Sequence, residues 1–302
     1  MDPLVSVVTA TYNRSSVLEL ALQTLLHQTF VNWELWVVGD ACTDDTAAVV
    51  EALGDPRARF VNLPQNCGEQ SGPNNEGVRR AHGRYIAFLN HDDFWFPDHL
   101  EKAVEQLETT GADLVFGMGA RIDPCGGVTL ASASPTGRWE PFVSVPASCW
   151  VLRRQAFEVV GEWRAARACW TTPSQEWLFR AGRAGLRMEL LPEMTVVILE
   201  SGRRPGSYRS GDATEHLHIH DRMKEPEAFR TELLTRAALA STGEALLPRG
   251  VGHHVRRASK DLVRRLCLAT GVSQQDVLAF ASYRRRGGLI EHARRVRGLP
   301  PQ

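Results

Sequence analysis

The sequence predicts an α/β fold in which a mostly parallel, Rossmann-like sheet is flanked by helices. Short β-branched and apolar runs alternate with helical patterns over the first hundred positions, as is typical of βαβ units. Polar loops follow several of these runs directly, where open parallel sheets bind ligands. The 302 residues are 43% hydrophobic and 23% charged, which lies in the globular range and excludes extended disorder.

The first part of the chain supplies the regular alternation. Buried strands, in which Val, Ile, Leu and Phe dominate, are expected at residues 4–10, 34–38, 59–63 and 85–89. Helices, marked by apolar periodicity or by polar first turns, are expected at residues 17–26, 46–53, 72–81 and 97–109. Right-handed crossovers then place three polar loops on one rim of the sheet, at residues 11–14, 39–45 and 90–95.

After residue 110 the pattern is less regular. A strand is expected at 113–118, and helices are expected at 153–160 and 174–184, each followed by a glycine. Residues 200–211 are rich in Gly, Arg and Ser and predict a mobile loop. From residue 225 onward the pattern is helical.

Charge is distributed unevenly along a chain of zero formal net charge. Residues 1–110 carry 7 basic and 16 acidic side chains, whereas residues 249–302 carry 12 basic and 3 acidic ones. Opposite charges favour either docking of the basic tail on the acidic part or contact between the tail and an anionic membrane surface. We expect no nucleic-acid partner.

The apolar runs and the N-terminal residues predict neither a membrane span nor a signal peptide. Apolar runs such as residues 86–89 and 196–199 are far shorter than the roughly 18 residues of a membrane span. The acidic N-terminus does not resemble a signal peptide, and six cysteines without a C-x-x-C pair favour free thiols in a reducing compartment. We therefore expect a cytoplasmic protein, with peripheral contact to the inner membrane face as a further option.

Carboxylates follow two of the predicted strands. Asp92 and Asp93 come directly after the strand at 85–89, and an oxygen-rich loop there suits Mn²⁺ or Mg²⁺ that holds a diphosphate. A solvated helix cap is the alternative. Asp40, which follows the strand at 34–38, is placed to accept a hydrogen bond from a base or ribose, or else to form an Asx turn.

Four segments, in this order, resemble the sequence blocks of the family 2 glycosyltransferases. Residues 5–14 (VSVVTATYNR) resemble the family's opening strand and loop. Residues 37–46 (VVGDACTDDT) resemble its VVDDGSTDDT block, and NCG at 66–68 with NEG at 75–77 resembles NxG…ARNxG. Residues 83–93 (GRYIAFLNHDD) are similar to GxYIxFLDxDD, which contains the metal-binding D-x-D motif.

This resemblance implies a GT-A fold and an inverting, metal-dependent transfer of a sugar from a nucleotide diphosphate donor. It implies a nucleotide-sugar-binding half at 1–110, an acceptor-binding and catalytic half at 111–225, and a helical basic extension at 226–302. A UDP-sugar is the expected donor because Asp40 matches the family's uracil-contacting carboxylate, and a dTDP-sugar would present the same ring edge. The acceptor is expected to be a glycan, a lipid-linked molecule or a small molecule.

The resemblance also assigns site residues. Those expected to bind the donor are Thr11, Tyr12, Arg14, Asp40, Asn75, Asp92, Asp93 and Arg204, the last in a loop that closes over the diphosphate. Asp92 is the expected metal ligand. The chain departs from the family where Asn90 replaces the first Asp of D-x-D, Gly39 replaces an Asp, and Pro73-Asn74 replaces Ala-Arg. Restoring Asp at position 90 is expected to be tolerated.

Inversion requires a general base within reach of the acceptor hydroxyl. Residues 174–181 (SQEWLFRA) resemble the family's block that carries this base, with Gln175 for Glu and Glu176 for Asp. Glu176 is therefore the predicted base, and a first-turn carboxylate that complements the helix dipole is the alternative.

A histidine cluster, EHLHIHD at residues 215–221, offers a further metal ligand. As a strand it would place three imidazoles on one face, and as a helix it would place His216 and His220 one turn apart. His218 is the predicted ligand, with a half-exposed polar face as the alternative.

Two other functions stay open at this point. A catalytically degenerate GT-A protein that binds nucleotide-sugars or acts as a scaffold is favoured by Asn90 and Gln175. A nucleotidyltransferase would share the sheet, but the loop at 11–14 does not resemble its Gly-rich phosphate loop.

Overall fold

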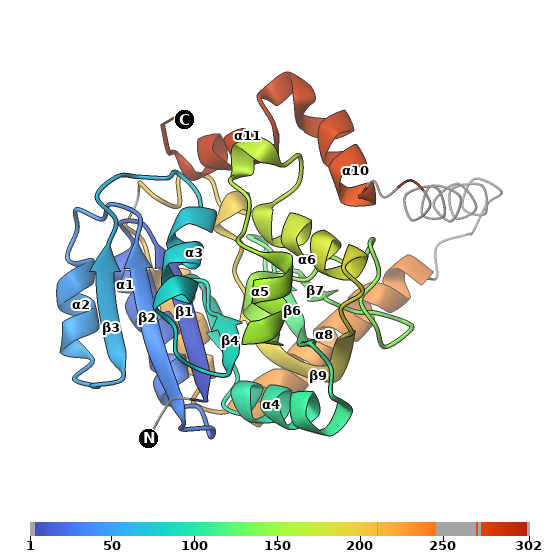
Figure 1. The fold of residues 1–302 in the computed structure, drawn as a ribbon, viewed down its shortest axis with the longest axis horizontal. Helices are drawn as coiled ribbons and strands as arrows, with labels where there is room; N and C mark the ends of the chain where they lie inside the picture. Colours follow the sequence, from blue (N-terminus) through green and yellow to red (C-terminus); the bar gives the residue numbers. More distant parts are fainter. Residues whose placement is uncertain (1–3, 210, 246–269, 271–272, 301–302) are drawn as a thin grey trace.

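The computed structural model describes residues 4–209, 211–245, 270 and 273–300. Within them, nine strands form one mixed sheet in the order β3-β2-β1-β4-β8-β6-β9-β5, with β7 paired to β6 (Figure 1). The strands are β1 (Val5–Thr11), β2 (Trp33–Gly39), β3 (Ala58–Asn62), β4 (Tyr85–Phe88), β5 (Asp93–Trp95), β6 (Leu114–Ile122), β7 (Val128–Ala131), β8 (Trp150–Arg153) and β9 (Met188–Ile198).

Helices cover both faces of this sheet. The α-helices are α1 (Ser15–Leu26), α2 (Thr46–Ala52), α3 (Ser71–Arg80), α4 (His99–Thr110), α5 (Arg154–Val160), α6 (Pro173–Arg183), α7 (Thr214–Arg222), α8 (Pro226–Ala245), α10 (Gln274–Tyr283) and α11 (Leu289–Arg297). Short 3₁₀ turns are η1 (Ala147–Cys149), η2 (Ala166–Ala168), η3 (Ser201–Arg203) and η4 (Arg284–Arg286). None of the helices in the described ranges combines the length and apolar character needed to cross a membrane.

The four strands expected in the first part of the chain form the parallel half of the sheet. β1 pairs in parallel with β2, from Val5 opposite Trp33 to Thr11 opposite Gly39. β1 also pairs in parallel with β4, and β2 with β3. Because parallel strands run in the same direction, their C-terminal ends lie at the same end of the sheet. The loops after β1, β2 and β4 therefore begin next to one another. The predicted Rossmann-like arrangement is confirmed for this part.

The second half of the sheet was only partly predictable. Residues 90–95 were expected to form a polar loop, but residues 93–95 form β5, which pairs antiparallel with β9. Phe94 and Trp95 are fully buried in this pairing, and their partners Val197 and Val196 lie about a hundred positions later in the chain. The expected strand at 113–118 continues to Ile122 for the same reason, because β9 pairs along its length.

The two expected halves share one sheet rather than standing apart. β8, from the second half, pairs antiparallel with β4 of the first, and β5 joins the far edge. An aromatic cluster strengthens this junction: the rings of Trp150 and Trp163 stack at 5.6 Å between centroids, and Phe88 lies 4.8 Å from Trp163. The boundaries at residues 110 and 225 stay predictions.

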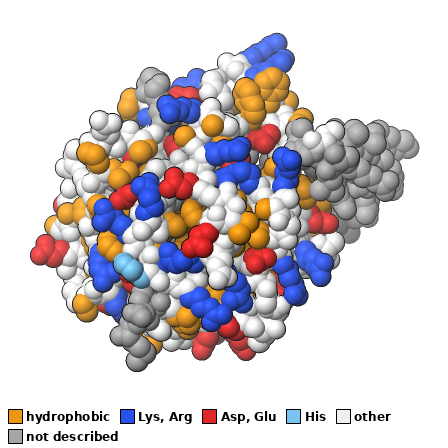
Figure 2. All heavy atoms as spheres, viewed as in Figure 1, with side chains coloured by type: hydrophobic (Ala, Val, Ile, Leu, Met, Phe, Trp, Pro, Cys, Tyr) orange, Lys and Arg blue, Asp and Glu red, His pale blue; other side chains and the backbone are white. Residues whose placement is uncertain are grey.

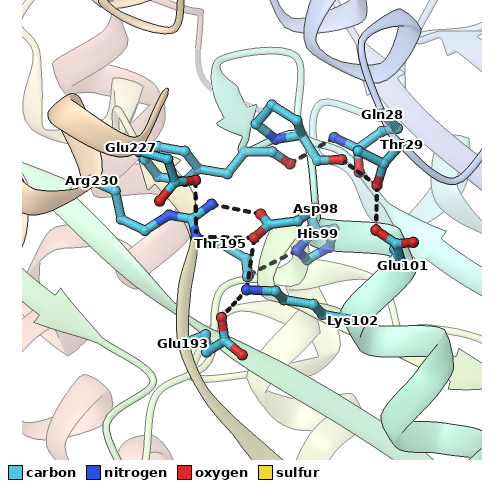
Figure 3. A network of polar contacts seen from close by, with 12 residues as sticks. Gln28, Thr29, Asp98, His99, Glu101, Lys102, Glu193, Thr195, Glu227 and Arg230 are labelled. Carbon is cyan, nitrogen blue, oxygen red and sulfur yellow. Dashed lines mark hydrogen bonds and ion pairs between the residues drawn. The ribbon is translucent and has the colours of Figure 1, made fainter. Parts of the chain in front are cut away.

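The helical extension packs against the body of the protein through α8. Arg230 donates to both carboxylate oxygens of Asp98, at 3.0 and 2.6 Å, and its guanidinium lies 4.6 Å from the ring centroid of Phe96. Figure 3 shows this network, in which Lys102 joins Asp98 and Glu193 and so connects α8, α4 and β9. Burial opposes ionisation of Asp98, but the hydrogen bonds from Arg230 and Lys102 hold its pKa below the usual range.

Candidate active site

A cavity of about 840 Å³ opens at the edge where β1, β2 and β4 end. Its wall combines the loops that follow these strands with the start of α6, the segment 198–208 and the helix α11. Figure 1 shows α10 and α11 along the edge toward which β2 and β3 point. The cavity is therefore placed where an open α/β sheet binds ligands.

Most of the predicted donor residues meet in this cavity. Those that line it are Thr11, Tyr12, Asp40, Asp92 and Asp93. Arg14 lies just behind them with 5% of its side chain exposed, and its Nη1 is 3.9 Å from a carboxylate oxygen of Asp92. Three sequence blocks that are far apart in the chain thus contribute to a single site.

Asp40 holds the end of β2 against the loop that follows β3. Its carboxylate accepts the backbone N–H groups of Cys67 at 2.6 Å and Gly68 at 2.9 Å, and its carbonyl accepts the side-chain amide of Asn66 at 2.8 Å. Gly68 has a φ of 74°, which favours glycine at this position. Burial raises the pKa of Asp40, although these hydrogen bonds and Arg294 act against the rise. The Asx turn expected as an alternative is replaced by this long-range contact.

The adjacent carboxylates Asp92 and Asp93 differ in environment. Asp93 is buried and accepts hydrogen bonds from Ser148 Oγ at 2.6 Å and Asn90 Nδ2 at 2.8 Å, and burial together with Asp92 raises its pKa. Burial also opposes ionisation of Asp92, but His91, Arg14, His216 and Arg297 around it hold its pKa below the usual range. Asp92 is therefore the carboxylate of the pair that faces the surrounding cationic side chains.

The contact between Asn90 and Asp93 bears on one expectation. An Asp at position 90 would place a second carboxylate where an amide now donates to buried Asp93, and two like charges at this distance oppose each other. The prediction that this substitution is tolerated stays a prediction. Asn90 acts here as a hydrogen-bond donor to Asp93.

The histidine cluster lies on helix α7, which separates its members. His216 is 3% exposed, faces Asp92 and Phe94, and its Nε2 has no hydrogen-bond partner among the described residues. Burial lowers the pKa of His216 to about 4, so the imidazole is neutral, which is the form that binds metals. His218 points to solvent because it lies about 200° around the helix from His216. This geometry gives no support to His218 as a ligand, and His216 is the histidine of the cluster that lies beside Asp92.

Two predicted donor residues serve the scaffold instead. Asn75 exchanges hydrogen bonds of 2.9 Å with the backbone N–H and C=O of Trp163 and does not line the cavity. Arg204 pairs with Glu215 and donates to the carbonyl of Ile122 at 3.1 Å, which fixes α7 to the sheet. Its neighbour Arg203 lines the cavity instead, with 59% of its side chain exposed.

Glu176 faces away from the cavity. Arg180 Nε donates to both of its oxygens, at 2.9 and 3.0 Å, and Arg164 lies 3.1 Å away. The preceding residue, Gln175, lines the cavity but exchanges hydrogen bonds of 3.1 and 2.6 Å with the backbone of Val145. The arrangement gives Glu176 the role of an ion-pair partner inside the second half of the fold and leaves its predicted role as base without geometric support.

The loop expected to be mobile is anchored around Tyr208. The ring of Tyr208 lies 6.4 Å from that of Tyr12, and its hydroxyl is 3.2 Å from His91 Nε2. The guanidinium groups of Arg14 and Arg297 lie 5.2 and 5.8 Å from its centroid. Arg297 and the rest of α11 were missed as site residues, and the only signal for them was the opposite charge of the two ends of the chain.

Comparison with known proteins shows that the first part of the chain is similar to one sequence family. The family model described as Glycosyl transferase family 2 matches residues 6–132. The succinoglycan biosynthesis protein ExoO of Rhizobium meliloti is 38% identical over 112 residues, which is 37% of this chain and 32% of that protein. An E. coli protein named UDP-Glc:alpha-D-GlcNAc-diphosphoundecaprenol beta-1,3-glucosyltransferase WfgD is 31% identical over 38% of this chain and 46% of its own length. These matches span less than half of either relative.

Solved structures match over nearly the whole chain. S. aureus TarS 1–349 in complex with UDP-GlcNAc superimposes with a TM-score of 0.56 at 16% identity, covering 97% of this chain and 90% of that one. The mannosyltransferase PcManGT from Pyrobaculum calidifontis, in complex with GDP-Man and Mn²⁺, gives a TM-score of 0.55 at 19% identity, covering 94% and 87%. At these identities the likeness concerns the fold, and the expected GT-A fold is confirmed.

Proposed function

We propose that the chain is a family 2 glycosyltransferase, which the match of the family model to residues 6–132 supports, and that it transfers a sugar from a UDP-sugar to an acceptor hydroxyl with inversion at the anomeric carbon. The observation that carries the proposal is the meeting of Tyr12, Asp40 and Asp92 in one cavity at the end of the parallel strands. These residues come from three of the four blocks through which the sequence resembles the family.

The nucleoside is proposed to bind between β1 and β2. Tyr12 offers an aromatic face for the base, and buried Asp40 offers a carboxylate to an N–H on the edge of uracil. The E. coli relative mentioned above is named for UDP-Glc, and TarS 1–349 is in complex with UDP-GlcNAc, which supports uridine as the base. Thymine would present the same edge, so a competition between UDP and dTDP decides this detail.

A divalent cation, Mn²⁺ or Mg²⁺, is proposed to bind at Asp92. Among the described residues no three acidic, His or Cys side chains form a complete metal site. Asp92 and the unpartnered Nε2 of neutral His216 nevertheless suit a divalent cation as ligands. Diphosphate oxygens of the nucleotide-sugar and water molecules would complete its coordination. A cation there would supply positive charge to the departing diphosphate. PcManGT, which shares the fold, is described with Mn²⁺.

The proton of the acceptor is proposed to go to Glu69 rather than to Glu176. Both Asp92 and Glu200 line the cavity beside cations, and Asp40 is held by backbone amides. Glu69 also lines the cavity, and it accepts hydrogen bonds from Ser71 and from the backbone N–H of Ala166. Burial raises the pKa of Glu69, and a carboxyl with a raised pKa is better suited to accept a proton.

A lipid-linked acceptor on an anionic membrane is proposed because of the surface around α10. Its apolar side chains are exposed by 39 to 56% and are Trp170, Val277, Leu278 and Phe280. Exposed Arg284 and Arg285 follow directly, and Figure 2 shows basic and hydrophobic side chains next to each other at the top, over α10 and η4. Gln275 and Tyr283 of α10 line the cavity, so this surface adjoins the site. Residues 246–269, which contain further basic residues, lie outside the described residues.

Asp92→Asn tests the donor and metal site. The variant should bind UDP without the gain in affinity that Mn²⁺ gives the wild type, and turnover should fall on the order of 10³-fold because several kcal/mol of charge stabilisation are lost. Calorimetry with and without Mn²⁺ and a donor-hydrolysis assay measure both effects. Asp45→Ala is the control, since Asp45 is exposed and does not line the cavity. Full activity of Asp92→Asn, or of the wild type in excess chelator, would contradict the metal assignment.

Glu69→Gln and Glu176→Gln separate the two candidate bases. Loss of a general base typically costs about 10²–10⁴-fold in rate, so Glu69→Gln should lose transfer by this factor and keep its UDP affinity. Glu176→Gln should keep transfer within a few-fold but unfold at lower temperature, because Arg180 and Arg164 lose their partner. The reverse pattern would restore Glu176 as the base. Binding of the donor with no turnover in the wild type would favour a binding module instead.

Vesicle flotation tests the membrane surface. The full-length protein should float with anionic vesicles at low salt, and the Leu278→Glu/Phe280→Glu variant should lose most of this binding because it places charge on the apolar face. Val31→Glu is the matched control, since Val31 is 68% exposed and precedes the N-terminal end of β2, away from the cavity at its C-terminal end. Failure of the wild type to float would remove the membrane proposal.

A further inference from the structure

The helix α11, from the C-terminal extension, forms one wall of the cavity. It is joined to the segment after β9 by two backbone hydrogen bonds, from Gly206 to the carbonyl of Val296 at 2.8 Å and from Tyr208 to that of Arg297 at 3.1 Å. Arg294, which is 4% exposed, donates to the carbonyl of Gly68 and so ties the helix to the Asp40 loop. Within the described residues, α11 of the basic tail thus docks on the body of the protein, next to the Asp40 loop of the acidic part.

Two guanidinium groups converge on one carboxylate at this wall. Arg14 and Arg297 both lie within 6 Å of the Tyr208 centroid, and both interact electrostatically with Asp92. Each has a buried nitrogen, Nη1 of Arg14 and Nε of Arg297, without a hydrogen-bond partner among the described residues. Buried N–H groups that lack an acceptor are costly, and one carboxylate does not balance two guanidinium groups. The wall therefore has cationic donors in excess of its own acceptors.

We infer that Arg297 binds the diphosphate of the donor together with Arg14, so that the C-terminal extension completes the donor site. This inference rests on the proposed function. A diphosphate supplies several strong acceptor oxygens and negative charge, which match the fork of a guanidinium group. Arg297 lines the same cavity as Asp92, and its main chain is fixed by the bond from Tyr208. Bound diphosphate would therefore hold α11 and the loop at 201–208 over the site.

The alternative is that α11 plugs the cavity and is displaced by the donor. The two possibilities predict opposite effects of removing the arginine: a donor contact weakens binding when it is lost, whereas a plug strengthens binding when it is loosened. The test therefore measures affinity for UDP, with uridine as a probe that lacks the phosphates.

Arg297→Gln in the full-length protein is the variant of choice. Glutamine keeps an aliphatic stem that can pack on Tyr208, but it removes the charge. By calorimetry with Mn²⁺, we expect UDP to bind about 10- to 100-fold more weakly and uridine to bind equally well. Arg297→Lys, which keeps the charge without the fork, should lose less. Arg295→Ala is the matched control on the same helix, since Arg295 is exposed and does not line the cavity.

Unchanged or tighter UDP binding by Arg297→Gln would overturn the inference, and tighter binding would identify α11 as a plug. An equal loss for UDP and uridine would also overturn it, because the effect would then not depend on the phosphates. A wild type that binds no nucleoside diphosphate would overturn the proposed function as well. A loss for UDP alone, with Arg295→Ala unchanged, supports the inference.

Discussion

Parallel pairing of β1 with both β2 and β4 is the constraint on which the rest of this structure depends. The pairing aligns Thr11 with Gly39 and Val8 with Phe88, the last residue of β4, so that Tyr12, Asp40 and Asp92 follow their strands at one end of the sheet. Asp40 then fixes the loop after β3 through the backbone of residues 67 and 68. A shift in register of one residue would turn the side chains of the shifted strand to the opposite face of the sheet, and these residues would no longer lie together.

Side chains from other parts of the molecule complete the site at the end of the parallel strands. Asp92 lies near the guanidinium groups of Arg14 and Arg297, with His91 and His216 beside it, and these residues come from four different segments of the chain. The acidic first part and the described helix α11 of the basic tail thus meet at the cavity, where Arg294 reaches the Asp40 loop. This arrangement explains how a chain with zero net charge keeps a locally cationic wall for a phosphate ligand.

The parts of the structure that the sequence predicted are those set by local pattern. β1 to β4 were recognisable because each is a short apolar run, and Thr11, Asp40 and Asp92 because each follows one directly. β5 and β9 were not, since their pairing joins residues about a hundred positions apart. Glu176 matched a motif, but the rotation of α6 turns its carboxylate toward Arg180 and Arg164. His216 differs from His218 only through the helical period of α7, and nothing local marks Arg297 as a site residue.

Hydrogen–deuterium exchange of the full-length protein, with and without UDP and Mn²⁺, tests the central claim most directly: that one ligand bridges the sheet edge and the C-terminal helix. The account predicts slower exchange in three separate segments, namely residues 11–14, 66–70 and 289–297, with α8 unchanged. Faster exchange in residues 289–297 on binding, or protection confined to the first two segments, would contradict it.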